Sequence, residues 1–270
     1  MDTPLVMGII NATPDSFYAG SRQQSIDMML SQAEKMIIDG AAILDIGGQS
    51  SRPGSVRISA DEENARVIPG IEAIRKSFPE IFISVDTYYA AVAREAIAAG
   101  ADIVNDISAG HMDQQMLSAV ASLNVPYVLM HMQGTPGTMH LAPQYEDVTR
   151  EVLDFFIRHV SKLHESGLDQ VIIDPGFGFG KTIAHNFELL KKLEVFSILE
   201  RPLLLGISRK STIYKTLGTT PEQALNGTSV LNTIGLLKGA SILRVHDVKE
   251  ATETIRLVSA VQCIQSNEDK

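Results

Sequence analysis

Polar side chains recur in this sequence at the ends of short apolar runs, where a strand buried on both faces would carry none. In chain order they are Asn11, Asp45 with Gln49, Asp86, Asn105 with Asp106, His131, Asp174, Ser208 to Lys210, and Arg244 with His246 and Asp247. A helix cap or a loop hydrogen bond would account for any one of them, and it fits Asp106 and Asp247 well. That explanation fits poorly for the polar residues that lie inside apolar strands, taken together: Asp45, Asn105, Asp174, Arg244 and His246. Burying so many polar groups costs free energy unless a ligand or partner satisfies them, so the pattern predicts a binding site.

Three of these side chains suit an anionic ligand. Arg244 and His246 are two residues apart on one predicted strand, so they share a face. A forked guanidinium beside an imidazole suits phosphate oxygens; the alternative is a salt bridge from Arg244 to an acidic strand end. Lys210 follows the seventh run in SRKS. It could be a solvated surface lysine, but its place beside the other strand ends favours the predicted site.

Eight apolar runs, alternating with longer stretches of helical period, predict the elements that position these residues. The runs are LVMGIIN (5–11), ILDIGG (43–48), FISVDT (82–87), IVNDIS (103–108), YVLMHM (127–132), VIIDPG (171–176), LLLGISR (203–209) and ILRVHD (242–247). Ser25–Asp39 and Glu146–Glu165 are predicted amphipathic helices. Eight βα units favour an α/β fold of the (β/α)8 TIM barrel type, with its active site at the carboxyl ends of the strands. An open doubly wound sheet is the alternative.

The bulk composition fits one enzyme-sized domain. The chain has 270 residues, of which 44% are hydrophobic, and no Pro/Gly/Ser-rich or charged linker divides it. We therefore expect a single domain over residues 1–270. The net charge of −9 argues against nucleic acid or an anionic membrane as a partner. The single cysteine, Cys263, and the absence of a secretory leader or an apolar run of membrane-spanning length predict a cytoplasmic protein.

Two segments imitate known motifs without meeting their spacing. PGFGFGKT (175–182) ends like a phosphate-binding P-loop, but Pro175 stands where the first glycine is required. HMQGTPGTMH (131–140) carries two histidines with no carboxylate at ligand spacing. We interpret that second segment as a Gly/Pro loop rather than a metal site.

The strand ends together resemble the dihydropteroate synthase family, from Pro4 almost to the end of the chain. The matching segments are NATPDSF (11–17), GGQSSRPG (47–54), SVDT (84–87), NDIS (105–108), HMQGTP (131–136), DPGFGFGKT (174–182), SRKS (208–211) and RVHD (244–247). Each motif alone is weak, but eight in this order are specific. The resemblance implies that 6-hydroxymethyl-7,8-dihydropterin diphosphate is joined to para-aminobenzoate, giving 7,8-dihydropteroate and diphosphate for folate biosynthesis, with help from Mg2+.

The resemblance also implies roles for individual residues. The catalytic set is Asn11, Lys210, Arg244 and His246, and Asn11 is the implied metal ligand. The pterin would bind Asp86, Asn105, Asp174 and Lys210, with Asp45 in support. The diphosphate would bind Asn11, Ser51, Arg52, Arg244 and His246. The para-aminobenzoate would bind Phe17, Ser51, Pro53, Phe179, Lys210 and Ser211.

Three positions depart from the family pattern in the first two loops. Ala19 stands where an acidic residue is common, Gln49 replaces a usual glutamate, and Ser51 a usual threonine. Two alternatives follow: a methyltransferase acting on methyltetrahydrofolate and a corrinoid, which shares the barrel and pterin pocket, or a non-catalytic pterin-binding paralogue.

The segment Pro221–Lys238 is apolar on several faces, and with the resemblance it predicts a homodimer interface.

Overall fold

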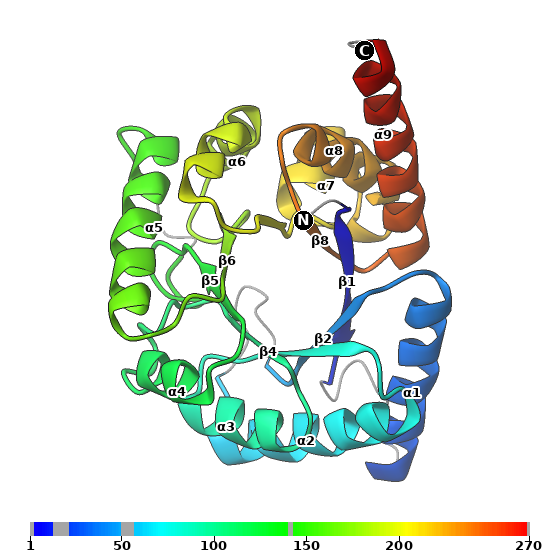
Figure 1. Cartoon of the computed structure of the whole chain (residues 1–270), viewed down its shortest axis with the longest axis vertical. Helices are drawn as coiled ribbons and strands as arrows, with labels where there is room; N and C mark the ends of the chain where they lie inside the picture. Colours follow the sequence, from blue (N-terminus) through cyan, green and yellow to red (C-terminus); the bar gives the residue numbers. More distant parts are fainter. Residues whose placement is uncertain (1–2, 13–21, 50–56, 140–142, 269–270) are drawn as a thin grey trace.

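All the strand pairs found in the computed structural model are parallel, and the strands surround a common axis with the helices outside them (Figure 1). The structure describes residues 3–12, 22–49, 57–139 and 143–268. The strands are β1 (Leu5–Asn11), β2 (Ile43–Gly47), β3 (Phe82–Asp86), β4 (Ile103–Asp106), β5 (Tyr127–Met130), β6 (Val171–Asp174), β7 (Leu204–Leu205) and β8 (Ile242–Val245). Each begins within one residue of a predicted run, so the eight strands are confirmed.

The order of the strands closes the sheet into a barrel. They run β6-β5-β4-β3-β2-β1-β8-β7, so β1 lies between β2 and β8. An isolated parallel bridge between Ile173 and Leu203 joins the two edges. This closure confirms the predicted (β/α)8 barrel against the open sheet. The seventh strand is shorter than its run, because the chain leaves the ladder at Gly206 to form the turn that carries Lys210.

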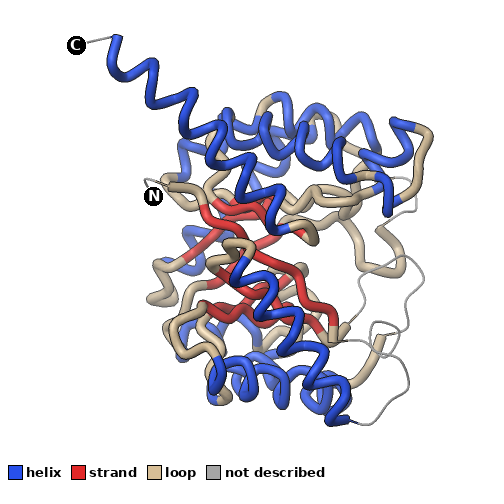
Figure 2. Tube along the Cα trace, turned by 90° about the vertical axis from the view of Figure 1, so that its right-hand side faces the viewer, coloured by secondary structure: helices blue, strands red, loops and turns tan. Residues whose placement is uncertain are grey.

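Helices connect successive strands as the sequence predicts. They are α1 (Arg22–Ile38), α2 (Ala60–Ser77), α3 (Ala90–Ala98), α4 (Met116–Leu123), α5 (Val148–Glu165), α6 (Ile183–Lys191), α7 (Ser211–Leu217), α8 (Leu225–Leu237) and α9 (Val248–Glu268), with 3-10 turns η1 (Leu193–Leu199) and η2 (Pro221–Gln223). Seen from the side, α9 extends past the body of the barrel (Figure 2). Among the described residues, no helix combines the length and apolarity that a membrane span needs.

The two-residue period of the strands explains where the polar side chains lie. A ring of apolar residues fills the barrel interior: Met7, Ile43, Ile103, Val128, Ile172, Leu204 and Ile242. Two residues further along their strands come Asp45, Asn105, Asp174 and Arg244. Alternate residues of a strand share a face, so these four side chains form the next layer toward the carboxyl ends. The apolar ring is therefore the floor of the candidate site.

Candidate active site

Arg244 is the centre of the polar layer. Its Nε lies 2.6 Å from Oδ2 of Asp45, and its Nη2 lies 2.5 Å from Oδ2 of Asp86. The salt bridge that the sequence offered as an alternative is thus present, and to two acids instead of one. Although burial opposes the charge, Asp45 and Asp86 raise the pKa of Arg244 above its ordinary value, so it is always cationic. Within the described part of the chain Nη1 makes no hydrogen bond, which leaves donors for a further anion.

Asp45 and Asn105 form the buried side of this layer. Asn105 donates from Nδ2 to Oδ2 of Asp45 over 3.1 Å, and both side chains are almost completely buried. The second oxygen of Asp45, Oδ1, is buried and has no hydrogen-bond partner among the described residues. A buried carboxylate oxygen without a donor is costly unless a ligand supplies one. The geometry therefore fits a ligand that presents N–H groups to the barrel.

Asp86 and Asp106 are both acids at strand ends, but they have different partners: Asp86 pairs with Arg244, whereas Asp106 accepts hydrogen bonds from neutral groups. Burial raises the pKa of Asp86, and the Arg244 charge opposes the rise while Asp45 adds to it. Asp106 instead accepts hydrogen bonds from Ser108, Gly110 and Tyr127 at 2.7–2.8 Å. The bonds from Ser108 and Gly110 fold the β4–α4 turn, and the Tyr127 hydroxyl joins this turn to β5. The loop hydrogen-bonding role predicted for Asp106 is therefore confirmed.

Asp174 and Lys210 face each other on the opposite side of the layer. A Cβ placed on Gly206 would lie 3.5 Å from Oδ2 of Asp174 and 3.9 Å from Nζ of Lys210, so the glycine leaves space between the two charges. Lys210 donates to the carbonyl of Phe177 at 2.5 Å and lies 4.5 Å above the centre of the Phe179 ring. Burial lowers the pKa of Lys210 to about 8, and Asp174 opposes that change. Lys210 is thus anchored beside the polar layer and is not a solvated surface lysine.

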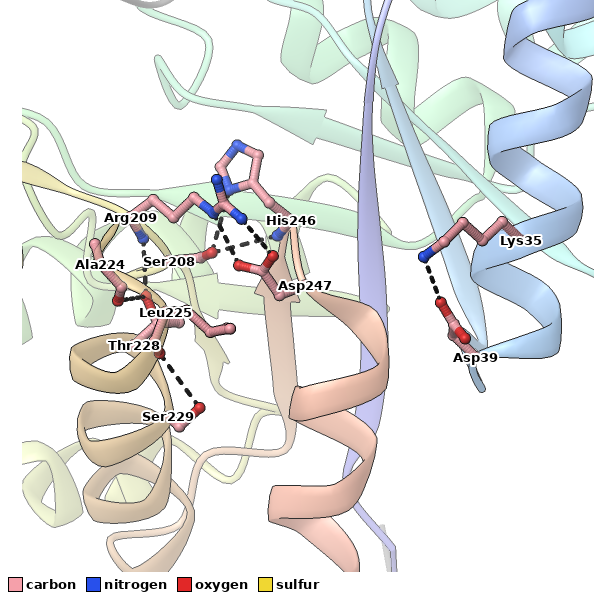
Figure 3. A network of polar contacts seen from close by, with 10 residues as sticks. All are labelled: Lys35, Asp39, Ser208, Arg209, Ala224, Leu225, Thr228, Ser229, His246 and Asp247. Atoms are coloured by element: carbon pink, nitrogen blue, oxygen red, sulfur yellow. Dashed lines mark hydrogen bonds and ion pairs between the residues drawn. The ribbon is translucent and has the colours of Figure 1, made fainter. Parts of the chain in front are cut away.

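His246 is held by Ser208 on the turn that also carries Lys210 (Figure 3). The backbone N–H of His246 donates to Oγ of Ser208 at 3.3 Å, and the same oxygen lies 3.1 Å from Nδ1 of the ring. Burial and the Arg244 charge lower the pKa of His246 to about 4. The imidazole is therefore neutral at pH 7. Asp247, predicted as a helix cap or a loop hydrogen bonder, directly precedes α9 and accepts two hydrogen bonds from the Arg209 side chain.

Asn11 ends β1 with an exposed side chain, in register with Gly47 of β2. Its amide oxygen is the kind of hard ligand that Mg2+ takes, and this ion usually needs only one or two protein oxygens beside water and substrate phosphates. An exposed side chain at the carboxyl end of the barrel meets that requirement. The residue therefore fits the ion that the resemblance implies.

The residues predicted to bind para-aminobenzoate divide into two groups. Phe179 of the β6–α6 turn contacts Lys210, and Ser211 follows Lys210 as the first residue of α7, so these three lie near one another at two adjacent loops. Phe17, Ser51, Arg52 and Pro53 lie outside the described residues, as does Ala19. The roles of all these residues stay predictions.

Gln49 is the one loop departure inside the described chain. Its Oε1 accepts hydrogen bonds from the backbone of Ile58 at 2.9 Å and from the hydroxyl of Tyr88 at 3.2 Å. A carboxylate could accept both bonds as well, so these two contacts do not distinguish the amide from the usual glutamate.

Two buried titratable residues beside the site, Lys181 and Glu63, were not predicted from the sequence. Lys181 contacts His131, which the sequence placed among the polar strand ends, although their segments were interpreted as an imitation P-loop and a Gly/Pro loop. Glu63 is completely buried in the first turn of α2. The glycines around Lys181 were the available signal. Glu63 gave none, because an acidic first turn is ordinary for any helix.

Comparisons with known proteins agree with this geometry. A family model described as pterin binding enzyme matches residues 7–246. The chain is 44% identical over 266 residues to dihydropteroate synthase of Escherichia coli K12, covering 98% of this chain and 94% of that protein. Its identity to the Bacillus subtilis dihydropteroate synthase is 45% over 259 residues, covering 95% and 88%.

Solved structures show the same likeness. The Yersinia pestis dihydropteroate synthase, in a complex with a sulfonamide drug, superposes with a TM-score of 0.91 at 41% identity, covering 97% of this chain and 95% of that one. The Xanthomonas albilineans dihydropteroate synthase with 4-aminobenzoic acid gives 0.90 at 40% identity, covering 97% and 94%.

Proposed function

The chain belongs to the dihydropteroate synthase family of transferases in folate biosynthesis, and we propose how its barrel mouth joins the dihydropterin diphosphate to para-aminobenzoate. The observation that carries the proposal is the polar layer itself. It sets buried acceptors, Asp45 and Asp174, on either side of a cationic Arg244. A flat ring rich in N–H groups and carrying a diphosphate matches both features.

The pterin lies over the apolar floor with its donors toward the acids. Asp174 accepts a backbone N–H from Gly176 through Oδ1, at 2.8 Å, and its Oδ2 faces the space above Gly206. Both oxygens keep free lone pairs for the amino group and ring N–H of a pterin. The Asn105 amide and the unpartnered Oδ1 of Asp45 extend the same edge. Asp86 takes a further donor, and Lys210 donates to the ring from across the space.

The diphosphate leaves toward Arg244 and His246. The electron-rich ring shares positive charge as the methylene–oxygen bond breaks, so the protein mainly stabilises the departing negative charge and orients the partners. Arg244 supplies N–H donors and His246 a neutral N–H. Asn11 would hold Mg2+, which when bound neutralises charge on the phosphate oxygens. The family resemblance implies that Ser51 and Arg52 bind the same group.

Para-aminobenzoate binds beside Phe179 with Ser211 at its carboxylate. Phe17, Ser51 and Pro53 are the further binding residues that the family resemblance implies. The aromatic amine of para-aminobenzoate is neutral at pH 7, so its nitrogen attacks the methylene without a strong base. The amine then loses one proton to the diphosphate or to solvent. Lys210, which lies over the Phe179 ring, contacts both substrates in this arrangement.

A diphosphate-release assay tests the proposal. Dihydropterin diphosphate and Mg2+ are supplied with and without para-aminobenzoate, and Arg244→Ala is compared with Arg158→Ala, an exposed arginine on α5. We expect release that requires para-aminobenzoate, collapses in Arg244→Ala and is unchanged in Arg158→Ala. Pterin binding without release in the wild-type protein would support the non-catalytic paralogue instead. The methyltransferase alternative is disfavoured by the family assignment.

We also propose a cytoplasmic homodimer. Val230 and Leu237 of α8 are 50% and 57% exposed, and Leu257 and Val261 of the adjacent α9 are 71% and 58% exposed. Four apolar side chains on two packed helices suit a second copy of the chain. Light scattering at micromolar concentration should give twice the monomer mass, and a monomer would contradict the proposal. The single cysteine suits a reducing compartment.

A further inference from the structure

Lys181 is a buried lysine that the proposed chemistry leaves without a role. Its side chain is 8% exposed, and its Nζ lies within hydrogen-bond distance of four acceptors. These are Nδ1 of His131 at 2.9 Å and the carbonyls of Gly176, Phe179 and His131 at 3.0, 3.1 and 3.2 Å. An ammonium has three N–H groups and no acceptor of its own, so this cage suits the charged form.

The imidazole of His131 is a permanent acceptor in this cage. Burial and the Lys181 charge lower the pKa of His131 to about 2, so the ring is neutral. Since Nδ1 faces the ammonium, the ring proton belongs on Nε2. Burial lowers the pKa of Lys181 to about 7, while the Asp174 carboxylate favours its charge.

Lys181 and its four acceptors join two loops, and two glycines allow these loops to approach each other closely. Gly176 and Gly180 both have positive φ, and a Cβ on either would fall within 2.3 Å of a carbonyl oxygen in the 131–133 segment. At this approach the carbonyls of Gly176, Phe179 and His131 converge, and only a donor can stabilise them. Lys181 is that donor, so it ties the β6–α6 turn to the end of β5.

The same turn supports the reactive side of the site. The carbonyl of Phe177 accepts the hydrogen bond from Lys210, and the Phe179 ring lies beneath the Lys210 ammonium. The turn is thus held between two ammonium groups, one at the mouth and one buried behind it. A shift of the turn would move the anchor of Lys210 and the proposed wall for para-aminobenzoate together.

We propose that Lys181 is a positioning residue of the synthase: its buried ammonium sets the shape of the Gly176–Gly180 turn and thereby the places of Lys210 and Phe179. This inference rests on the proposed function, because it assigns that turn to para-aminobenzoate. Lys181 itself touches neither substrate in this arrangement. Its loss should therefore weaken the use of para-aminobenzoate more than the binding of the pterin.

Steady-state kinetics of Lys181→Met test the inference, with Lys191→Met as the matched control on an exposed lysine of α6. Met keeps the stem but removes the donors. We expect the KM for para-aminobenzoate to rise roughly 10-fold and kcat to fall, while the KM for the dihydropterin diphosphate changes less than roughly 3-fold. The control should match the wild type. A lower melting temperature with unchanged KM values in the folded protein would overturn the inference, because Lys181 would then serve stability alone.

His131→Leu provides a milder variant should Lys181→Met not fold. It removes one acceptor of four, so we expect the same selective rise in KM, roughly 3-fold, and no rise would count against positioning by the cage. In wild-type protein with 15N-labelled histidine, the Nδ1 signal of His131 should stay that of an unprotonated nitrogen from pH 5 to 8; a protonated Nδ1 would contradict the contact. Wild-type turnover in the same assay distinguishes the synthase function from the positioning role of Lys181. Absence of turnover in the wild type would contradict the proposed function and not the contacts around Lys181.

Discussion

Arg209 and Asp247 form a two-point ion pair that joins the turn after β7 to the start of α9. Nε and Nη2 of the arginine lie 2.9 and 2.6 Å from the two carboxylate oxygens (Figure 3). The backbone of Arg209 has a positive φ of 54°, and its N–H donates to the Thr228 hydroxyl at 3.1 Å. A left-handed conformation costs a non-glycine residue about 1–2 kcal/mol. The pair therefore stabilises the strained residue that directly precedes Lys210.

Asp247→Asn should release this turn without touching either substrate. The amide loses the charge and one acceptor, so we expect kcat/KM for para-aminobenzoate to fall roughly 10-fold and the free energy of unfolding to fall by about 1 kcal/mol. Asp39→Asn is the matched control, because the Lys35–Asp39 pair is a surface i,i+4 contact worth only a few tenths of a kcal/mol. Kinetics and urea unfolding measure both variants. Equal effects in the two would contradict a special role for the Arg209–Asp247 pair.

The alkaline limit of activity should report Lys210. Its pKa is lowered to about 8, so the ammonium that contacts Phe179 is lost as the pH rises through that value. We expect kcat/KM to decline above pH 8. In Lys210→Arg, where the cation persists, residual activity should be lower and the step centred near pH 8 should be absent, whereas a step centred near pH 7 would report Lys181. A step near pH 8 that survives in the arginine variant would contradict the assignment to Lys210.

His246 should act as a neutral donor and not as a proton carrier. Its backbone N–H donates to Ser208 Oγ, so the hydroxyl can donate to Nδ1, which leaves the ring proton on Nε2. Gln offers an N–H at a similar reach, whereas Leu offers none. We therefore expect His246→Gln to keep kcat within roughly 10-fold and His246→Leu to lose roughly 100-fold or more. Single-turnover assays of diphosphate release distinguish them, and equal losses would mean that the imidazole itself is required.

The barrel and the polar layer could be predicted from the sequence because both depend on the two-residue period of buried strands. Ile43, Ile103, Ile172 and Ile242 each precede a polar residue by two positions, and the structure places the apolar member in the floor and the polar one above it. The apparent misfit of Asp45 in an apolar strand was therefore the signal of the site. The pairing of Arg244 with two acids was only partly foreseen, because contacts across strands depend on their register.

The residues behind the layer could not be predicted in the same way. Lys181 follows a glycine-rich turn whose local spacing shows no partner, and its cage is completed by His131, 50 residues away. Sequence patterns record periods within one element, whereas this contact depends on the approach of two loops. Glu63 presents the same difficulty, since only the packing of α2 on the barrel shows that it faces inward.

Glu63 carries a buried carboxyl group that should be protonated at neutral pH. It is completely buried beside Gly48, and neither carboxyl oxygen has a hydrogen-bond partner in the described part of the chain. Burial, helped by the Asp86 charge, raises its pKa from 4.5 to about 8, and Thr87, Arg66 and Arg57 oppose the rise only partly. The folded protein thus holds a proton that the unfolded chain releases above pH 4.5.

Glu63→Gln should make the protein less sensitive to pH between 5 and 8. In the wild type, stability from this group is full below pH 4.5 and is lost as the pH rises toward 8, because the unfolded state binds fewer protons there. The glutamine removes that loss, so its advantage over the wild type should grow by about 3–4 kcal/mol from pH 5 to pH 8. Urea unfolding at both values measures it, with Glu62→Gln, the exposed neighbour, as the control. A difference independent of pH would show that Glu63 is ionised in the folded protein.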